Sequence, residues 1–196
     1  MNPLSDIPLL RRSFFFLRHG ETEANRHGVV AGSMDVPLTP LGHAQAREAA
    51  AALQGQGITA IYTSSLSRAR DTADYVAQAL GLPVVTIPEI GERNWGILEG
   101  KPRALRKPGV TPPGAETPEV YAARVWKGLA LVAGVVPLVV AHSGVFRVLC
   151  TALGIPERTN PIANAVPLRC VPPGPEHSEW RFEPLQPMIA PRRVGS

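Results

Sequence analysis

The 196-residue sequence predicts one α/β domain, and three observations support this prediction. Apolar segments with the spacing of strands alternate with segments that have the spacing of helices, as in domains built on a parallel sheet. Two of the apolar segments end in a short polar stretch, at the edge where open α/β sheets bind ligands. With 44% hydrophobic and 18% charged residues, the chain can bury a core without disulfides or a structural metal.

The expected elements follow from apolar periodicity and from the residues that begin and end helices. Thr39 and Pro40 form a suitable N-cap and first helical position, whereas Gly81 and Pro83 form a stop signal. The β-branched run 135–141 is typical of a central parallel strand. We expect strands at 14–17, 58–63, 84–87 and 135–141, and weaker ones near 165–171 and 179–185. We expect helices at 40–53 and 66–80, from 117 or 118 to about 133, and after 144 to 153.

Residues 91–118 are rich in Gly and Pro and show no regular period, so we expect a loop or lid within a single domain spanning 1–196. Four basic side chains lie in it, namely Lys101, Arg103, Arg106 and Lys107. Two roles fit them about equally, contact with phosphate and the solubility of an exposed loop. We expect the tail 187–196 to be flexible.

The basic excess is mild, with a formal net charge of +4 that suits an anionic substrate. No Lys/Arg run resembles those of nucleic-acid-binding proteins, so nucleic acid is not an expected partner. The most apolar stretch, 129–141, is interrupted by Gly134 and Pro137 and is shorter than the roughly 20 residues of a membrane span. Cys150 and Cys170 form no CxxC pattern. We therefore expect no membrane contact, disulfide framework, zinc site or targeting segment, and a cytoplasmic location.

Histidines follow two of the predicted strands, His19 after the first and His142 after the β-branched run. If both strands are central and parallel, the two imidazoles face one crevice. A neutral imidazole can act as a nucleophile near pH 7 and form a covalent phosphoryl intermediate, which makes His19 the candidate. The charge of phosphoryl transfer needs fixed donors, for which Arg18, Arg68 and a protonated His142 are candidates. Asn25, six residues after His19, is a candidate neutral donor.

The alcohol that leaves a phosphate monoester takes up a proton, so the site also needs a carboxylic acid close to the phosphate. Glu92 is the candidate, and Glu21 and Glu99 are lesser ones. Glu89 and Glu116 compete for the same role. Taken alone, Glu92 is more often a surface carboxylate than an acid catalyst.

Several motifs resemble those of the histidine phosphatase (phosphoglycerate mutase-like) superfamily. They occur in the family's order and span about residues 14–147, so their joint occurrence by chance is small. The first is Leu17-Arg18-His19-Gly20-Glu21-Thr22 followed by Asn25. The others are Gly32-Ser33-Met34-Asp35 with Pro37-Leu38-Thr39, Leu41-Gly42 and Gln45-Ala46; Tyr62-Thr63-Ser64-Ser65-Leu66-Ser67-Arg68-Ala69; Glu92 to Gly100; and Ala141-His142-Ser143-Gly144 with Arg147.

The resemblance implies a three-layer α/β/α sandwich with a central, mostly parallel sheet. It also implies that His19 is the phosphohistidine nucleophile and that Arg18, Arg68 and His142 form the phosphate pocket. Glu92 is then the proton donor. The resemblance implies neither a metal nor an organic cofactor.

Two features depart from the family pattern. Ser143 stands where glycine is common, and the segment between Glu92 and the next helix is proline-rich and short. Either departure would change the fit of the substrate rather than abolish the chemistry. We include Ser143, with Asn25, among the expected phosphate-binding residues.

The expected activity is metal-independent hydrolysis of a small phosphorylated metabolite. Phosphatases and mutases of this family share the phosphohistidine and differ in what accepts the phosphoryl group. The mutases have a longer, water-excluding insertion after the Glu-Gly segment, so the short stretch 100–118 favours a phosphatase. A phosphoglycerate mutase-type phosphotransferase is the alternative, and a non-catalytic phosphate-binding module is disfavoured by the intact residue set. The sequence does not distinguish among sugar phosphates, a ribazole phosphate and phosphoproteins as substrates. It also does not distinguish a monomer from a homodimer.

Overall fold

The computed structural model describes residues 7–155 and 162–185, and within them the strands form one six-stranded sheet. The strand order is β3-β2-β4-β1-β5-β6. The first four of these are mutually parallel, whereas β5 is antiparallel to both of its neighbours. The bounds are β1 (Phe14–Arg18), β2 (Ala60–Thr63), β3 (Val84–Thr86), β4 (Pro137–Ala141), β5 (Leu168–Val171) and β6 (Arg181–Pro184). The expected mostly parallel sheet is confirmed, and the expected flexible tail lies outside the described residues.

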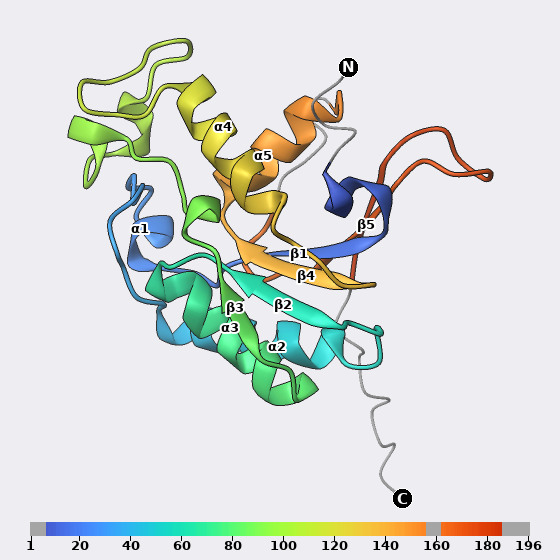
Figure 1. Ribbon diagram of the computed structural model, residues 1–196. Coiled ribbons are helices and arrows are strands. Elements are labelled where there is room, and N and C mark those ends of the chain that lie inside the picture. The colour runs from blue at the N-terminus through green and yellow to red at the C-terminus, as the bar shows by residue number, and fades with distance from the viewer. Residues whose placement is uncertain (1–6, 156–161, 186–196) are drawn as a thin grey trace, which may run out of the picture.

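Helices cover both faces of the sheet, with α2 and α3 on one side and α4 and α5 on the other (Figure 1). The α-helices are α1 (Glu23–Arg26), α2 (Pro40–Leu53), α3 (Ser67–Leu80), α4 (Pro118–Leu129) and α5 (Ser143–Ala152). Short 3-10 helices are η1 (Pro8–Arg11), η2 (Pro88–Ile90), η3 (Gly96–Leu98) and η4 (Arg103–Leu105). This arrangement confirms the three-layer α/β/α fold class.

The core consists of two apolar clusters, one on each face of the sheet, and strand β1 contributes to both. Its side chains alternate, so Phe14 and Phe16 pack on the α4 and α5 side, and Phe15 and Leu17 pack on the α2 and α3 side. All four are at most 2% exposed. Burial of each such side chain contributes about 1.5–3 kcal/mol. β4 alternates in the same way, which makes these two neighbouring strands the rigid centre from which the polar residues project.

The expected N-cap of α2 is confirmed, because Thr39 Oγ1 accepts a hydrogen bond from the Gly42 N–H at 3.0 Å. Strands β2 and β4 each begin two residues later than expected, at Ala60 and Pro137. The Val136 N–H donates to Thr59 Oγ1 at 3.1 Å rather than to a neighbouring strand. The Thr59 N–H donates to the Val136 carbonyl at 2.9 Å, so one backbone bond and one side-chain bond join these two residues just before the ladder begins.

Two further boundaries differ from the expectation, and a residue with a positive φ lies close to each of them. Helix α4 ends at Leu129 rather than near 133, and the turn that follows contains Gly134 with a φ of 99°. Strand β5 begins at Leu168 rather than 165, because Ala165 has a φ of 50°, outside the extended region. Composition alone does not reveal either angle.

The segment between η2 and α4 contains no long helix or strand, as expected for residues 91–118, but it is tied down at several points. In Figure 1 this green-to-yellow segment lies beside α1 and the start of α4. Isolated bridges pair Trp95 with Ala115 and Val29 with Pro102. In the part of the chain described, no helix is long and apolar enough to cross a membrane.

Candidate active site

The two candidate histidines follow neighbouring parallel strands, whose carboxyl ends meet at one edge of the sheet. Arg18 is in register with Ala141, and the His19 N–H donates to the Ala141 carbonyl at 3.0 Å. The next residue in each segment is a histidine, and the ring centroids of His19 and His142 lie 5.2 Å apart. The structure therefore brings the two imidazoles together as the sequence predicted.

The His19 ring is held in one tautomer. Nδ1 lies 2.7 Å from the Gly20 carbonyl, which can only accept, so Nδ1 donates and the lone pair is on Nε2. Burial lowers the pKa of His19 well below 6.5, and His142 and Arg68 lower it further. A neutral ring with a free Nε2 lone pair has the state that a nitrogen nucleophile needs.

His142 is fully buried behind His19 and does not line the cavity itself. Its Nε2 shares a hydrogen bond with Ser64 Oγ at 2.7 Å, and its Nδ1 has no partner among the described residues. Burial, followed by the charge of Arg68, lowers the pKa of His142 well below 6.5. The protein alone therefore favours a neutral His142 rather than the protonated ring that we expected. A phosphate dianion beside it would act in the opposite direction.

Half-buried Arg18 and buried Arg68 bring two guanidinium groups to the same place. Arg18 Nη1 donates to the Ile162 carbonyl at 3.0 Å, and Arg68 donates to the Gly32 and Met34 carbonyls at 2.8 Å each. Burial lowers the pKa of Arg18 to about 10 and also lowers the pKa of Arg68. The Nε of each arginine is buried without a hydrogen-bond partner among the described residues. Such a donor costs about 1–3 kcal/mol unless a ligand satisfies it.

Asn25 lines the same cavity with its amide oxygen already occupied. That oxygen accepts from Thr22 N and Oγ1 at 3.2 Å and from Asn164 Nδ2 at 3.1 Å. The Asn25 amide nitrogen is therefore the group left to donate to a ligand. Asn164 also donates to the His19 carbonyl at 2.9 Å, so it braces both residues.

Glu92 lines the cavity with its carboxylate fixed by four donors. Oε1 accepts from Arg93 N at 2.9 Å and Tyr121 OH at 3.2 Å. Oε2 accepts from Gly144 N at 3.1 Å, at the start of α5, and from Ser143 Oγ at 3.4 Å. Gly144 is required here, because a Cβ at that position would overlap Glu92 Oε1. Ser143, predicted as a phosphate ligand, lines the cavity with its hydroxyl directed at Glu92.

The other four candidate carboxylates, Glu89 among them, do not line the cavity, and three of them have structural partners. Glu21 accepts from Thr39 Oγ1, and Glu99 accepts from Ser33 Oγ and the Ser33 and Trp95 N–H groups. Glu116 pairs with Arg124 at 2.7 Å. Among the five candidates, Glu92 alone is placed to reach a ligand beside His19.

The cavity that contains these residues has a volume of about 1040 Å³. Of the four basic residues expected in the lid, three line it and Lys101 does not. Arg93, Trp95, Trp126 and Arg147 also line it. Trp126 is half-buried at the cavity wall. In the described residues, no group of three or more His, Cys, Asp or Glu side chains could hold a metal ion.

Comparisons with known proteins agree with this arrangement. Residues 14–166 match the family model of the histidine phosphatase superfamily, branch 1. The chain belongs to the histidine phosphatase superfamily. One relative, named probable phosphoglycerate mutase GpmB of Yersinia enterocolitica, is 37% identical over 72% of this chain and 75% of its own length. Another, the uncharacterized phosphatase PhoE of Bacillus subtilis, is 37% identical over 72% of this chain and 78% of its own.

Solved structures of other proteins share the fold. A mycobacterial glucosyl-3-phosphoglycerate phosphatase in complex with VO3 superposes with a TM-score of 0.72 at 27% identity. The match covers 87% of this chain and 97% of the other. A structure titled mycobacterial hydrolase 1 has the same TM-score and identity over 88% and 97% of the two chains. A histidine phosphatase forms its phosphohistidine at such a site, so the chain is an enzyme of this family.

Sequence reasoning missed several residues that support the histidine phosphatase site. Ser64 lies in a quoted motif, but its contact with His142 depends on the pairing of β2 with β4. Asn164 lies at the far end of the chain with no motif around it. Tyr121 occupies an apolar position of a predicted helix, where an aromatic residue is most simply core. A buried tyrosine hydroxyl usually has a partner, which is the one available signal.

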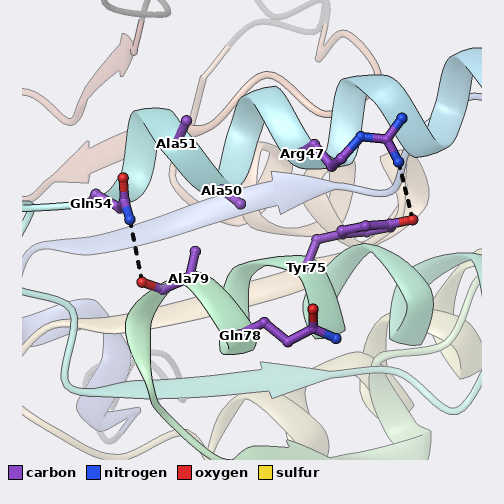
Figure 2. A pocket seen from close by; sticks show the side chains of 7 residues that line it. All are labelled: Arg47, Ala50, Ala51, Gln54, Tyr75, Gln78 and Ala79. Atoms are coloured by element: carbon purple, nitrogen blue, oxygen red, sulfur yellow. Dashed lines mark hydrogen bonds between the residues drawn. The ribbon is translucent and has the colours of Figure 1, made fainter.

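A second, smaller groove lies away from the histidines, on the outer side of α2 and α3 (Figure 2). It has a volume of about 360 Å³. Gln54 Nε2 donates to the Ala79 carbonyl at 3.4 Å and Arg47 Nη1 to the Tyr75 hydroxyl at 3.3 Å, so these bonds bridge the two helices. The groove presents small and neutral side chains with one arginine and offers no nucleophile or acid.

Proposed function

We propose that this histidine phosphatase hydrolyses a phosphate monoester without a metal ion, with His19 as the nucleophile. The Nε2 lone pair attacks phosphorus, the bond from phosphorus to the alcohol oxygen breaks, and the alcohol takes a proton from Glu92. Water then attacks the phosphohistidine, gives a proton to Glu92 and releases inorganic phosphate as the N–P bond breaks. His19 and Glu92 return to their initial states.

The observation that supports this proposal most is the set of unsatisfied buried groups around His19. Nε of Arg18, Nε of Arg68 and Nδ1 of His142 have no protein partner among the described residues. Oxygens of a phosphoryl group, carrying spread negative charge, would satisfy the donors of Arg18 and Arg68, which line the cavity. The Asn25 amide nitrogen offers a further contact.

The proposed acid role of Glu92 rests on its place at the cavity wall, where it is the one carboxylate among the described residues, and on its firm position. Four donors hold the carboxylate at the cavity wall, so it does not need to reorganise when substrate binds. Ser143 is then a positioning residue for Glu92, and direct contact between its hydroxyl and phosphate is the alternative proposal for that side chain.

Hydrolysis rather than mutase transfer is favoured by the short segment over the cavity. Arg103 and Lys107 in this segment are exposed, so water has a route to the phosphoenzyme. A mutase must keep its phosphohistidine from water while the intermediate reorients. The names of the relatives include both a mutase and a phosphatase, so transfer to a second phosphoglycerate remains the alternative function.

The first experiment measures release of nitrophenol and inorganic phosphate from p-nitrophenyl phosphate in EDTA, beside a His19→Ala variant. EDTA-resistant hydrolysis that disappears in the variant is the expected result. A parallel reaction contains 3-phosphoglycerate and 2,3-bisphosphoglycerate. Isomerisation with little phosphate release would establish the mutase instead, and no turnover of either kind would contradict both.

The expected partner is a small phosphorylated metabolite rather than nucleic acid. Cys150 and Cys170 are both buried, and the reducing conditions of the proposed cytoplasmic location would keep them as thiols. A homodimer is part of the same proposal, and light scattering in solution tests it.

A further inference from the structure

The cavity carries far more positive charge than one phosphate group needs. Seven of the described side chains that line it are Arg or Lys, and Glu92 is the sole carboxylate among them. Arg18 and Arg68 are at the inner end beside His19. A phosphate dianion there neutralises the charge of about two cations, so further cations, Arg103, Arg106 and Lys107 among them, remain at the outer end.

The outer cluster is organised around the indole of Trp95. The guanidinium carbons of Arg106 and Arg93 lie 3.6 Å and 4.3 Å from the ring centroid. Two guanidinium groups so close to one ring centre would overlap on the same face, so they cover opposite faces. The indole therefore fixes the two cations and has no open face on which a base could stack.

Arg106 also lies within a field of like charges. Burial lowers its pKa to about 10, and Arg147, Arg103 and Arg93 lower it as well, whereas Glu92 opposes this effect. Arg93 is committed to the Glu116 carbonyl, to which it donates from Nε at 2.9 Å and from Nη2 at 2.6 Å. The repulsion on Arg106 is relieved if an anion binds next to it.

The backbone that carries Arg103 and Arg106 is tied to the loop that follows β1. Val30 N donates to the Lys101 carbonyl at 2.9 Å, and Arg103 N donates to the Gly28 carbonyl at 2.7 Å. The bridge between Val29 and Pro102 lies between these two bonds. The backbone that carries the outer cations is therefore fixed relative to the loop that follows His19, and the Trp95 ring holds the Arg106 guanidinium, as a second binding site requires.

We propose that the alcohol half of the substrate carries a second anionic group, a carboxylate or a second phosphate, which binds Arg106 and Arg103 while the transferred phosphoryl group binds beside His19. This inference rests on the proposed function. It selects small, doubly anionic phosphate monoesters over substrates whose alcohol is a neutral sugar or an aromatic nucleoside. Specificity then comes from the short segment over the cavity rather than from the inner residues.

The test compares matched substrates that differ only in the second anion. 3-Phosphoglycerate and glycerol 3-phosphate differ by a carboxylate, and fructose 1,6-bisphosphate and fructose 6-phosphate differ by a phosphate. We expect kcat/KM to be about ten-fold or more higher for the anionic member of at least one pair, and the pair concerned identifies the source of the anion. Adenosine 5′-monophosphate tests the aromatic alternative and should be a poor substrate.

The variants Arg106→Gln and Arg103→Gln should each reduce that ratio of kcat/KM, Arg106→Gln by about ten-fold. Arg103 is exposed and does not pack on the Trp95 ring, so its variant is informative even if Arg106→Gln fails to fold. Lys101→Gln is the matched control, because Lys101 lies in the same segment outside the cavity, and it should leave the ratio unchanged.

Equal kcat/KM within both pairs would overturn the proposal. So would a higher kcat/KM for adenosine 5′-monophosphate than for the doubly anionic substrates, or a ratio of kcat/KM that is unchanged in both arginine variants. Calorimetry on His19→Ala gives the ratio of dissociation constants within each substrate pair, and this measurement requires no turnover. Absence of all His19-dependent hydrolysis with intact binding ratios would therefore remove the proposed function and keep the second anion site. His19-dependent hydrolysis with equal values within both pairs would keep the proposed function and remove the second anion site.

Discussion

At the inner end of the cavity Arg18 ends strand β1 and His19 follows it, whereas at the outer end Arg103 and Arg106 lie on a segment without regular strands. The inner side chains are positioned by the register of β1 with β4, which a change in one loop does not alter. The outer side chains are positioned by a few backbone bonds and one indole ring. This difference suggests that the chemistry belongs to the sheet and the choice of substrate to the segment above it.

Replacement of one inner cation should have the largest effect on the chemistry. Arg68→Lys keeps the charge but loses the planar fork, and we expect kcat/KM for p-nitrophenyl phosphate to fall roughly hundred-fold or more. Arg70→Lys is the control, because Arg70 is exposed on the same helix. Thermal denaturation of both variants separates loss of activity from loss of fold. Similar activities in two folded variants would mean that Arg68 does not hold the phosphate.

A methyl group at the start of α5 should disturb the acid without touching the phosphate pocket. The added Cβ of Gly144→Ala would displace the Glu92 carboxylate, and we expect kcat to fall roughly ten- to hundred-fold. Gly174→Ala is the matched control, since nothing lies within 4 Å of a Cβ there. Steady-state kinetics on phenyl phosphate measures both. An unaffected kcat in folded Gly144→Ala would argue against Glu92 as the proton donor.

Removal of one hydroxyl beside Glu92 should have a smaller effect that depends on the leaving group. Tyr121→Phe loses the 3.2 Å bond to Glu92 Oε1, so the acid is less well positioned. We expect kcat/KM to fall several-fold for phenyl phosphate and less for p-nitrophenyl phosphate, whose leaving group needs little protonation. An equal decrease for the two esters would assign Tyr121 to packing alone.

The two buried histidines should also make the fold less stable in mild acid. Their pKa values are lowered in the folded state, so the unfolded chain binds more protons below pH 6.5. The free energy of unfolding should therefore fall as pH decreases through 6.5, by at most about 1.4 kcal/mol per pH unit for each histidine. Urea titrations at several pH values should show a shallower slope for His142→Gln. The exposed His27→Gln should keep the slope of the original protein.

Much of the fold was predictable from the sequence because its signals are local. Thr39 and Pro40 specify the start of α2 through one side chain and one fixed φ angle, and the apolar run before Arg18 needs no distant partner to be recognised as a strand. The predicted boundaries are wrong where a long-range contact determines the start or end of an element. Thr59 Oγ1 accepts from the Val136 N–H just before β2 and β4 begin, and no local pattern shows that bond.

The features of the site also divide into those that local motifs predict and those that depend on distant contacts. The motif resemblance selected His19 and Glu92, and the structure places both in one cavity. The state of His142 was not predictable, because its pKa depends on burial and on Arg68, which lies far away in the sequence. The clamp of Arg93 and Arg106 on Trp95 was also missed, since three residues of a loop have no period from which to infer a stack.

The most direct test of the central claim is to trap the phosphoenzyme. The protein is mixed with substrate for milliseconds and quenched in alkali, where phosphohistidine survives, and the labelled peptide is then identified by mass spectrometry. We predict one phosphoryl group on the peptide that contains His19, attached at Nε2, and none in His19→Ala. Active enzyme that yields phosphate with no phosphohistidine, or with the label on another residue, would contradict the account.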